Sequence, residues 1–324
     1  MPANTNESRK VAAMVEYKPE GSLIFSNKNR ELLSNYEGLK RAMKNGAILE
    51  SNALLCDKDL NLHVELNSEI RGIIPKEEAT LAQNGESAKD IAILTRVGKP
   101  VCFKVVGFRE LITGKKEAIL SRKAAQTECI QSYISLLTSG DIIPAKVTHL
   151  ERFGAFCDIG CGIISLLSID AISVSRITHP SERLRIGDLI YTTVKSIDER
   201  GRIFLSSKEL LGTWEENVAL FNEGQTVTGI VRSIENYGIF IELTPNLAGL
   251  AEYKSNIFEG QKAAVYIKSI IPEKMKIKLI IIDTENADHV REPLKYFVDT
   301  SKGAHLDYWS YSPRSAKKKV ETIF

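Results

Sequence analysis

The sequence predicts a mainly β chain of three tandem five-stranded barrels, joined by short helices and followed by a partly helical tail. The first observation is an internal repeat. The pattern of residue types in the segment Phe153–Ile159 is found again in Tyr237–Leu243, 84 residues later. The second is the rhythm of each repeat, in which five short alternating segments are separated by glycines. Five strands favour a Greek-key barrel of the OB type, because a two-sheet sandwich needs about seven.

The N-terminal part of the chain shows little regular pattern. Residues 1 to about 30 are polar and include two prolines and a glycine, so we expect a mobile arm. A short helix follows from Glu31 to Lys44, where apolar residues recur near helical spacing. Arm and helix together form the segment 1–45.

The barrels, their connections and the tail follow in order. In the tail, Glu285–Val298 is expected to be helical although Pro293 interrupts it. The aromatic cluster Tyr308–Tyr311 either docks on the last barrel or stacks on unpaired bases, and docking is the simpler interpretation. The expected boundaries are 46–123 for a degenerate first barrel, 124–139 for a linker helix, 140–207 for the second barrel, 208–222 for a second linker helix, 223–283 for the third barrel and 284–324 for the tail.

Composition limits the classes of protein that the chain can belong to. Its 324 residues contain 43 Lys plus Arg and 41 Asp plus Glu, so the net charge of +2 argues against broad polyanion binding by charge alone. No apolar run approaches the ~18–20 residues that cross a bilayer, and the N-terminus lacks the apolar core of a secretory signal. Five cysteines without framework spacing suit a reducing compartment, so we expect a cytoplasmic protein.

The central strand of the second repeat has one small apolar side and one aromatic, charged side. Ala155, Cys157 and Ile159 alternate with Phe156 and Asp158. The first side suits a barrel interior, and Cys157 is expected there rather than in a zinc site. A large aromatic beside a charge makes a poor core, so the second side is interpreted as a platform on which unpaired bases stack.

Four motifs follow one another along the second repeat. They are an aromatic-Gly-x-aromatic turn, Gly-Ile-Ile, Ile-Gly-Asp before the fourth strand, and Asp-x-x-Gly-Arg-Ile-x-Leu-Ser at the end. With them the chain resembles the RNA-binding domain named for ribosomal protein S1, clearly over 140–207 and 224–283 and in degenerate form over 46–123. The resemblance implies tandem OB-type domains.

The resemblance also implies which residues of the second barrel bind RNA. Members of the family hold single strands with two aromatics on the second strand, a histidine near the third strand, and an Asp and an Arg around the last turn. Phe153 and Phe156 match the aromatics, and Asp198 and Arg202 match the last pair. Ser165 stands where the histidine lies, so one contact of the family is missing.

Phe204 extends this set by strand parity. Because Ile203 and Leu205 must face the barrel interior, Arg202 and Phe204 are expected to face outward together. Arg202 can pair with phosphate or stack on a base, and Asp198 either orients Arg202 or accepts from a base edge. The alternative is that the aromatic residues plug a barrel end or a domain interface.

The third barrel keeps part of the pattern. Tyr237 and Phe240 match the aromatics, and Lys276 stands for the arginine after a one-residue insertion, whereas Ile271 replaces the Asp. The first barrel is not expected to bind RNA in the manner of the family, because other residues occupy the corresponding positions: Leu60, His63 and Glu117.

The leading hypothesis is a non-catalytic, bacterial-type protein that binds single-stranded RNA such as mRNA in translation, with the first barrel contacting the small ribosomal subunit. The alternative is a protein-interaction adaptor whose barrels have largely lost RNA binding. An enzyme is not expected, because no carboxylate cluster, phosphate loop or nucleophile–base pair is seen, and His149 is expected to face inward. No cofactor, metal or membrane partner is expected.

Overall fold

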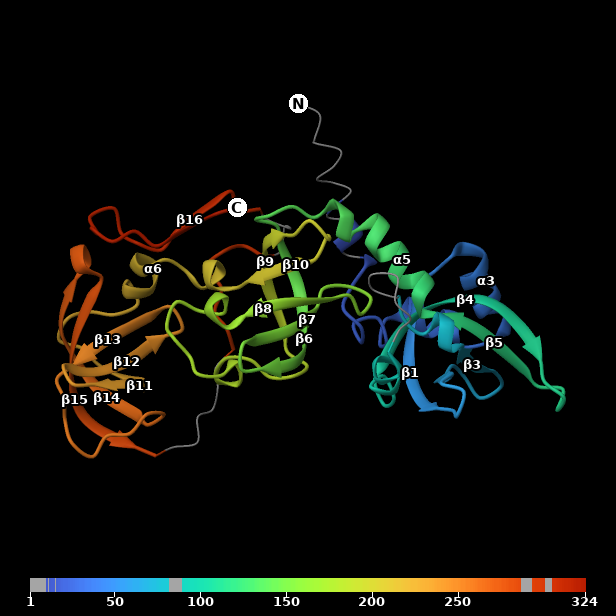
Figure 1. Ribbon diagram of the computed structural model, residues 1–324, viewed down its shortest axis with the longest axis horizontal. Helices are drawn as coiled ribbons and strands as arrows, with labels where there is room; N and C mark the ends of the chain where they lie inside the picture. Colours follow the sequence, from blue (N-terminus) through green and yellow to red (C-terminus); the bar gives the residue numbers. More distant parts are fainter. Residues whose placement is uncertain (1–9, 11, 15, 82–88, 287–292, 301–304) are drawn as a thin grey trace, which may run out of the picture. The chain divides into compact units, whose positions relative to one another are not determined.

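The computed structural model divides into two compact units, each built around closed β-sheets (Figure 1). The structure describes residues 10, 12–14, 16–81, 89–286, 293–300 and 305–324. Unit 1 comprises Met1–Leu137 and Asp158–Ile164, and unit 2 comprises Thr138–Cys157 and Ser165–Phe324. The prediction of a mainly β chain is confirmed. None of the helices in these residues is long and apolar enough to cross a bilayer.

Unit 1 is built on a closed sheet with the strand order β1-β2-β3-β5-β4. Neighbouring strands pair antiparallel, except that β3 and β5 are parallel. The described elements of this unit are α2 (Asn27–Leu33), α3 (Tyr36–Asn45), β1 (Leu49–Cys56), β2 (Leu62–Glu65), β3 (Arg71–Ile74), η1 (Lys76–Glu78), α4 (Asp90–Leu94), β4 (Pro100–Glu110), β5 (Lys116–Ser121), α5 (Arg122–Ser132) and η2 (Ile134–Leu136).

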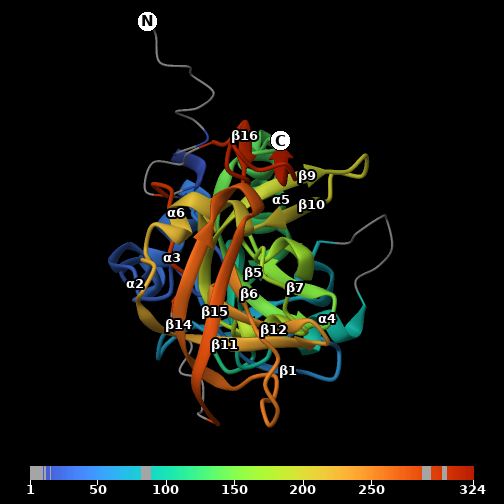
Figure 2. The same ribbon diagram turned by 90° about the vertical axis from the view of Figure 1, so that its left-hand side faces the viewer.

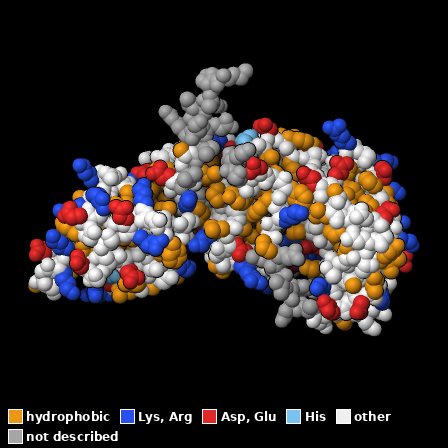
Figure 3. Space-filling view, turned by 180° about the vertical axis from the view of Figure 1, so that it is seen from behind, with side chains coloured by type: hydrophobic (Ala, Val, Ile, Leu, Met, Phe, Trp, Pro, Cys, Tyr) orange, Lys and Arg blue, Asp and Glu red, His pale blue; other side chains and the backbone are white. Residues whose placement is uncertain are grey.

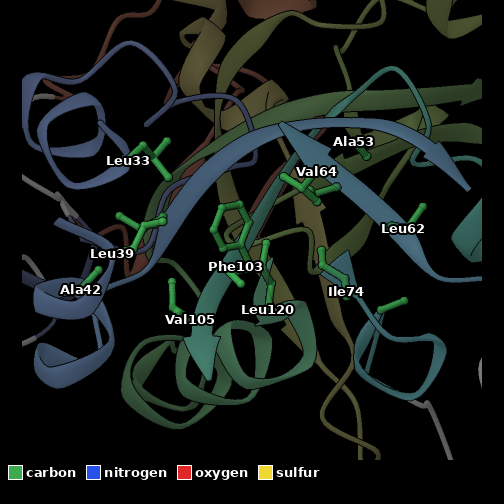
Figure 4. Close-up of a cluster of buried hydrophobic side chains, with 14 of the residues drawn as sticks. Leu33, Leu39, Ala42, Ala53, Leu62, Val64, Ile74, Phe103, Val105 and Leu120 are labelled. Atoms are coloured by element: carbon green, nitrogen blue, oxygen red, sulfur yellow. The ribbon is translucent and has the colours of Figure 1, made fainter. Parts of the chain in front are cut away.

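The core of unit 1 is filled from the inward side of its strands and from one face of α3 (Figure 4). Phe103 on β4 and Leu120 on β5 are fully buried, and Leu39 and Ala42 on α3 belong to the same cluster. The spacing of three between Leu39 and Ala42 places both on one helix face. Gly46 ends α3 in the left-handed conformation (φ 62°), which turns the chain into β1.

The segment expected to be a mobile arm is packed in its described part. Tyr17 and Glu20 are both buried. The Cys161 N–H donates to the Lys18 carbonyl at 2.9 Å, and Glu20 pairs with Arg122. A buried arginine requires an anionic partner, and Glu20 supplies it from a segment without any periodic pattern. No local pattern in the sequence therefore indicates this contact.

The second barrel has the strand order β10-β8-β7-β6-β9, and β8 and β10 run parallel as β3 and β5 do in unit 1. Ala155 and Cys157 are fully buried, as predicted for the inward side of β7. Residues 158–164, which connect β7 to β8, are part of unit 1. The elements are β6 (Ile142–Glu151), β7 (Gly154–Asp158), β8 (Ile164–Ser168), η3 (Ile169–Ala171), η4 (Pro180–Glu182), β9 (Leu189–Ile197) and β10 (Ile203–Ser206).

The third barrel has the order β11-β12-β13-β15-β14, with β13 and β15 parallel. Figure 2 turns this barrel toward the viewer and shows β14 and β15 as long strands side by side. The elements are β11 (Thr226–Glu235), β12 (Gly238–Thr244), β13 (Leu247–Ala251), β14 (Lys262–Ile271), η6 (Pro272–Lys274) and β15 (Lys276–Glu285).

The connection between these two barrels is more broken than the single helix expected over 208–222. It consists of η5 (Lys208–Leu211) and α6 (Trp214–Val218), separated by Gly212 at φ 85°. Asn246, in the β12–β13 turn, is fully buried against this connection. Its Nδ2 donates to the carbonyls of Lys208 and Gly212 at 2.8 Å each, and its Oδ1 accepts the Val174 N–H at 2.9 Å. One side chain thus joins both barrels of unit 2.

The C-terminal tail is not helical in its described part, so that prediction is wrong there. β16 (Tyr308–Ser310) and β17 (Glu321–Ile323) form a two-stranded sheet. Trp309 and Tyr311 are buried in the core cluster of the third barrel, which agrees with the docking interpretation. Part of the expected helix, 287–292, lies outside the described residues. Pro293 lacks the N–H that a helix interior needs, and burial of the two aromatics favours extended chain.

Candidate nucleic-acid interface

Phe153 and Phe156 meet at the start of β7. Their ring centroids are 5.9 Å apart and the rings lie edge to face at 89°. The Ile169 N–H donates to the Phe153 carbonyl at 2.9 Å, and Thr148 Oγ1 donates to the Phe156 carbonyl at 3.0 Å. These bonds fix the backbone of both aromatics. Because Phe153 is 54% exposed, its ring is accessible to a ligand.

A glycine separates the two aromatics because β8 passes too close for any side chain. A Cβ atom built on Gly154 lies 2.4 Å from the Leu167 carbonyl oxygen. In the third barrel a Cβ on Gly238 lies 2.4 Å from the Ala251 carbonyl oxygen, and Gly238 also has a φ of 149°. The glycine of the aromatic-Gly-x-aromatic motif is therefore required by close packing of the neighbouring strand, next to the two exposed aromatic rings.

His149 is a residue that sequence reasoning misplaced. It was expected to face the barrel interior, but its side chain is 58% exposed. Its ring lies 6.3 Å from that of Phe156 at an interplanar angle of 27°, and its Nε2 lies 2.8 Å from Glu151 Oε1. The alternation that buries Ala145 and Val147 does not continue to His149 near the end of β6, and the sequence alone does not reveal where it stops. His149 thus adds a third ring to this aromatic surface.

Asp198 and Arg202 form the turn between β9 and β10. Asp198 Oδ1 accepts the N–H groups of Arg200 and Arg202 at 2.9 Å each, and its Oδ2 accepts Arg202 Nε–H at 2.7 Å. The backbone N–H of Arg202 and then its side chain hold the pKa of Asp198 below its usual value. Asp198 therefore orients Arg202, whose other guanidinium nitrogens remain exposed to solvent.

The strand register places Leu166, not Ser165, beside this surface. Leu166 is the direct partner of Phe204 in the parallel ladder between β8 and β10. Both side chains are half-buried, whereas Ser165 is buried. The residue matched to the histidine of the family therefore faces inward, and an apolar side chain takes the outward place.

Asp158 does not share the outward side with Phe156, contrary to the prediction. It is buried within unit 1, where its Oδ2 accepts the Glu20 N–H at 2.7 Å and its Oδ1 accepts the N–H groups of Gly160 and Gly162. Burial, followed by the nearby charge of Glu20, raises the pKa of Asp158 to about 7. The charge therefore serves the fold of unit 1 and not a platform.

In the third barrel Tyr237 and Phe240 form the same edge-to-face pair, with centroids 6.1 Å apart at 89°. Tyr237 is 69% exposed. Phe240 is the direct partner of Leu250 on β13, and Leu250 is the partner of Lys278 on β15. Phe240, Leu250 and Lys278 therefore form a row across three strands. Leu250 follows Leu166 by 84 residues, which is the shift of the repeat.

The register therefore matches Lys278 to Phe204. Lys276, the residue singled out from the sequence, is exposed at the start of β15 and pairs with Ile271 in register. Lys278 was missed because the shorter loop before β14 changes the offset from 84 to 74 residues. A count from the closing motif, from Leu205 to Leu279, reveals the correspondence.

The equivalent row in the first barrel lacks aromatics. His63 is the partner of Ile73, and Ile73 is the parallel partner of Ile119. His63 Nε2 lies 3.1 Å from Asp57 Oδ2. Glu117, at the position of the arginine, is buried and paired with a neighbouring arginine of β4, Arg109. This arrangement offers a base little surface on which to stack.

The surface charge agrees with the net charge of the chain. On the face that Figure 3 shows, Lys and Arg side chains are interspersed with Asp and Glu. Within the described residues, no group of three or more His, Cys, Asp or Glu side chains is arranged to hold a metal ion. The chemistry that these surfaces support is stacking with a few placed cations, rather than a broad basic field or metal chemistry.

Comparison with known proteins finds relatives of this chain. The family "S1 RNA binding domain" matches residues 136–208. The small ribosomal subunit protein bS1 of Staphylococcus aureus is 30% identical over 283 residues, which cover 84% of this chain and 68% of that protein. That of Staphylococcus epidermidis is 30% identical over 294 residues, covering 86% and 72%. Among solved structures, a multidomain protein with nucleic acid binding domains from Streptococcus pneumoniae is 15% identical over 73% of each chain, with a TM-score of 0.25.

Proposed function

Because this chain belongs to the family of small ribosomal subunit protein bS1, we propose that it is a non-catalytic protein that binds single-stranded RNA in translation. The resemblance to S1-type domains that the sequence motifs indicated is confirmed by the family match. We further propose a cytoplasmic location and mRNA as the RNA that it holds.

The observation that carries this proposal is the repeated pair of exposed aromatics. Phe153 with Phe156, and Tyr237 with Phe240, have nearly the same edge-to-face geometry on the equivalent strand of two barrels. Paired aromatics exposed on a barrel strand offer flat surfaces on which bases can stack, and stacking contributes roughly 1–3 kcal/mol per base. Arg202 stands at the edge of the second set, where it can contact a phosphate or a base.

The proposed organisation is a tandem of three OB-type domains, at 46–123, 140–207 and 223–283. In its support, each of the three sheets has a parallel pair between its third and fifth strands and antiparallel pairs elsewhere where the register is defined. Contacts such as those of Asn246 hold the second and third barrels in one unit. Two platforms in one unit bind a single strand with a raised effective concentration.

The first barrel is proposed to contact protein on the small ribosomal subunit rather than RNA. Its row of His63, Ile73 and Ile119 has one imidazole, which is engaged by Asp57, and no phenyl ring equivalent to Phe156 or Phe204. An adaptor in which all three barrels bind protein remains the competing function. The exposed aromatic pairs of unit 2 argue against it, because they are the feature that such an adaptor does not need.

Fluorescence-anisotropy titration of a labelled, unstructured RNA of ~20 nucleotides tests the proposal, since such a length exceeds the site of one OB fold. Single-strand binding is expected to be much tighter than binding of the matching duplex. The variant Phe153→Ala with Phe156→Ala is expected to lose roughly 10-fold or more in affinity. Phe25→Ala is the matched control, because Phe25 is exposed and lies outside the proposed surface.

The competing adaptor function makes the opposite prediction. It expects no single-strand binding at tens of micromolar, and an unchanged interaction with ribosomal subunits in the double aromatic variant. Sedimentation of the wild-type and variant proteins with small subunits distinguishes the two functions. Loss of RNA affinity with retained subunit binding supports a division of work between the first barrel and the other two.

A further inference from the structure

Each of the three barrels has a β-bulge at the same place. In each barrel the ladder between the fourth and fifth strands skips one residue of the fourth strand. The skip lies opposite the outward residue of the fifth strand and the residue that follows it. The skipped residues are Val106, Lys195 and Lys268 in barrels one, two and three. A skipped residue in a bulge is released from the ladder, and its side chain is re-aimed. These three positions therefore lie next to Ile119, Phe204 and Lys278.

In the third barrel the bulge places Lys268 of β14 beside Lys276 and Lys278 of β15, so three lysines form a cluster on the outer face. Ser269 is the partner of Lys278 and Ile271 that of Lys276, so Lys268 lies one residue from this pairing. All three lysines are exposed. In the part of the chain that the structure describes, none of them forms an ion pair.

Among the described residues, the nearby carboxylates form no ion pair with this cluster. Glu223 is engaged with the backbone, since its Oε1 accepts the Ile270 N–H at 2.6 Å. Glu273 lies in the exposed turn η6 between the two strands. Lys262, further along β14, pairs with Glu285 at 3.6 Å and belongs to the other end of the ladder. Three free ammonium groups thus stand beside the row that begins at Phe240.

The second barrel differs at the same positions. Phe204 replaces the cation of Lys278, and Lys195 lies 4.0 Å from Asp170 Oδ2. At the position of Lys276 the second barrel has Arg202, whose Nε is engaged by Asp198. The second barrel therefore presents rings where the third presents unpaired positive charge.

We propose that Lys268, Lys276 and Lys278 contact the phosphates of the single strand whose base stacks on Phe240, so that the third barrel supplies most of the salt-dependent binding. The second barrel then supplies stacking that depends little on salt. An aromatic ring and a cation in one row suit a polymer that carries a base and a phosphate in each residue. This inference rests on the proposed binding of single-stranded RNA.

The test is the dependence of affinity on salt, measured with the full chain and the ~20-nucleotide RNA between ~50 and ~200 mM salt. Each phosphate contact with a single strand contributes a slope of about −0.7 in log K against log salt, so the variant Lys268→Gln, Lys276→Gln, Lys278→Gln is expected to be shallower by about 2. Phe153→Ala with Phe156→Ala is expected to lose affinity about equally at every salt concentration and to keep the slope.

A second triple variant removes the same charge elsewhere. Lys58→Gln, Lys99→Gln and Lys115→Gln change three exposed lysines of unit 1, and the wild-type slope is expected. Circular dichroism and thermal unfolding of all variants check that the barrels remain folded.

The outcomes separate this inference from the function on which it rests. If wild-type protein binds RNA and the double aromatic variant weakens it, but the lysine variant keeps the wild-type slope, the inference about the third barrel is overturned while the function stands. An equal loss of slope in the unit 1 variant also overturns it, because a general charge effect then explains the data. If the wild-type protein binds no single strand, both fall together.

Discussion

Arg122 and Glu20 form a buried two-point ion pair in unit 1. Arg122 Nε donates to Glu20 Oε1 at 2.6 Å, and Nη2 donates to Oε2 at 3.0 Å. Burial alone raises the pKa of Glu20, but the guanidinium of Arg122 outweighs burial and holds that pKa below its usual value. Glu20 Oε1 also accepts the Cys102 N–H at 3.1 Å. One carboxylate thus joins the N-terminal segment to α5 and β4.

We expect Arg122→Ala to lower the free energy of unfolding by about 3–5 kcal/mol, because it leaves a buried carboxylate without its partner. Arg122→Lys keeps the charge but loses the two-point geometry, so an intermediate loss is expected. Urea unfolding followed by circular dichroism measures both. Arg41→Ala is the control, since the exposed pair with Glu31 at 3.2 Å is worth under ~1 kcal/mol. A loss in Arg122→Ala as small as in the control contradicts the assigned role.

The stability of unit 1 is expected to fall as the pH rises from about 4 to about 7. Burial raises the pKa of Glu50 to about 7, and the charges of Glu20 and Asp158 add to this rise. In the unfolded chain a glutamate titrates near ~4.3. The folded state therefore binds more protons in this window, and the free energy of unfolding decreases with increasing pH. The contribution of Glu50 is about 3 kcal/mol, complete below the window and lost above it.

Glu50→Gln checks this pH dependence. The amide stays neutral at every pH, so the variant is expected to unfold less easily than wild type at pH ~8 and about equally at pH ~5. Urea unfolding at several pH values measures the difference. Glu31→Gln changes an exposed carboxylate and is expected to leave the pH profile unchanged. An identical profile for Glu50→Gln and wild type means that Glu50 is ionised in the folded protein.

Gly154→Ala is expected to damage both the fold and RNA binding. The new methyl group lies 2.4 Å from the Leu167 carbonyl oxygen, so β7 must move away from β8 and take Phe153 and Phe156 with it. A loss of about 1–3 kcal/mol in unfolding free energy is expected. Gly107→Ala is the matched control, because its nearest neighbour is an Ile119 methyl group at 3.9 Å. Equal thermal stability of the two variants argues against close packing as the reason for the glycine.

Asn246→Ala is expected to loosen the second barrel from the third. It leaves the carbonyls of Lys208 and Gly212 and the Val174 N–H buried without partners, at a cost of about 2–4 kcal/mol. Hydrogen exchange at Val174 is expected to accelerate as local opening becomes easier. Asn222→Ala, in an exposed position, is expected to change stability by less than ~0.5 kcal/mol. Unchanged protection at Val174 contradicts the joining role.

Much of the fold could be predicted from the sequence, because it depends on residues that are neighbours along the chain. The alternation of Ala155 and Cys157 with Phe156 predicted an inward and an outward side of β7, and the structure buries the first two completely. The glycine-separated repeat predicted five strands in each barrel, because turns and strand alternation are properties of neighbouring residues. Phe153 and Phe156 were both singled out from the sequence, and the structure brings their rings together.

Contacts between distant segments decided what the sequence left open. Asp158 was assigned to the platform by alternation, but the backbone N–H groups of Glu20, Gly160 and Gly162 draw it into unit 1. The different loop lengths of the two repeats obscure the match of Lys278 to Phe204, and the ladder registers of β8 with β10 and of β13 with β15 show it directly. The alternation of inward and outward side chains along a strand is determined by the residues of that strand. Register, burial of charge and the docking of a tail are set by the partner that the folded chain brings opposite, and so only the tertiary structure reveals them.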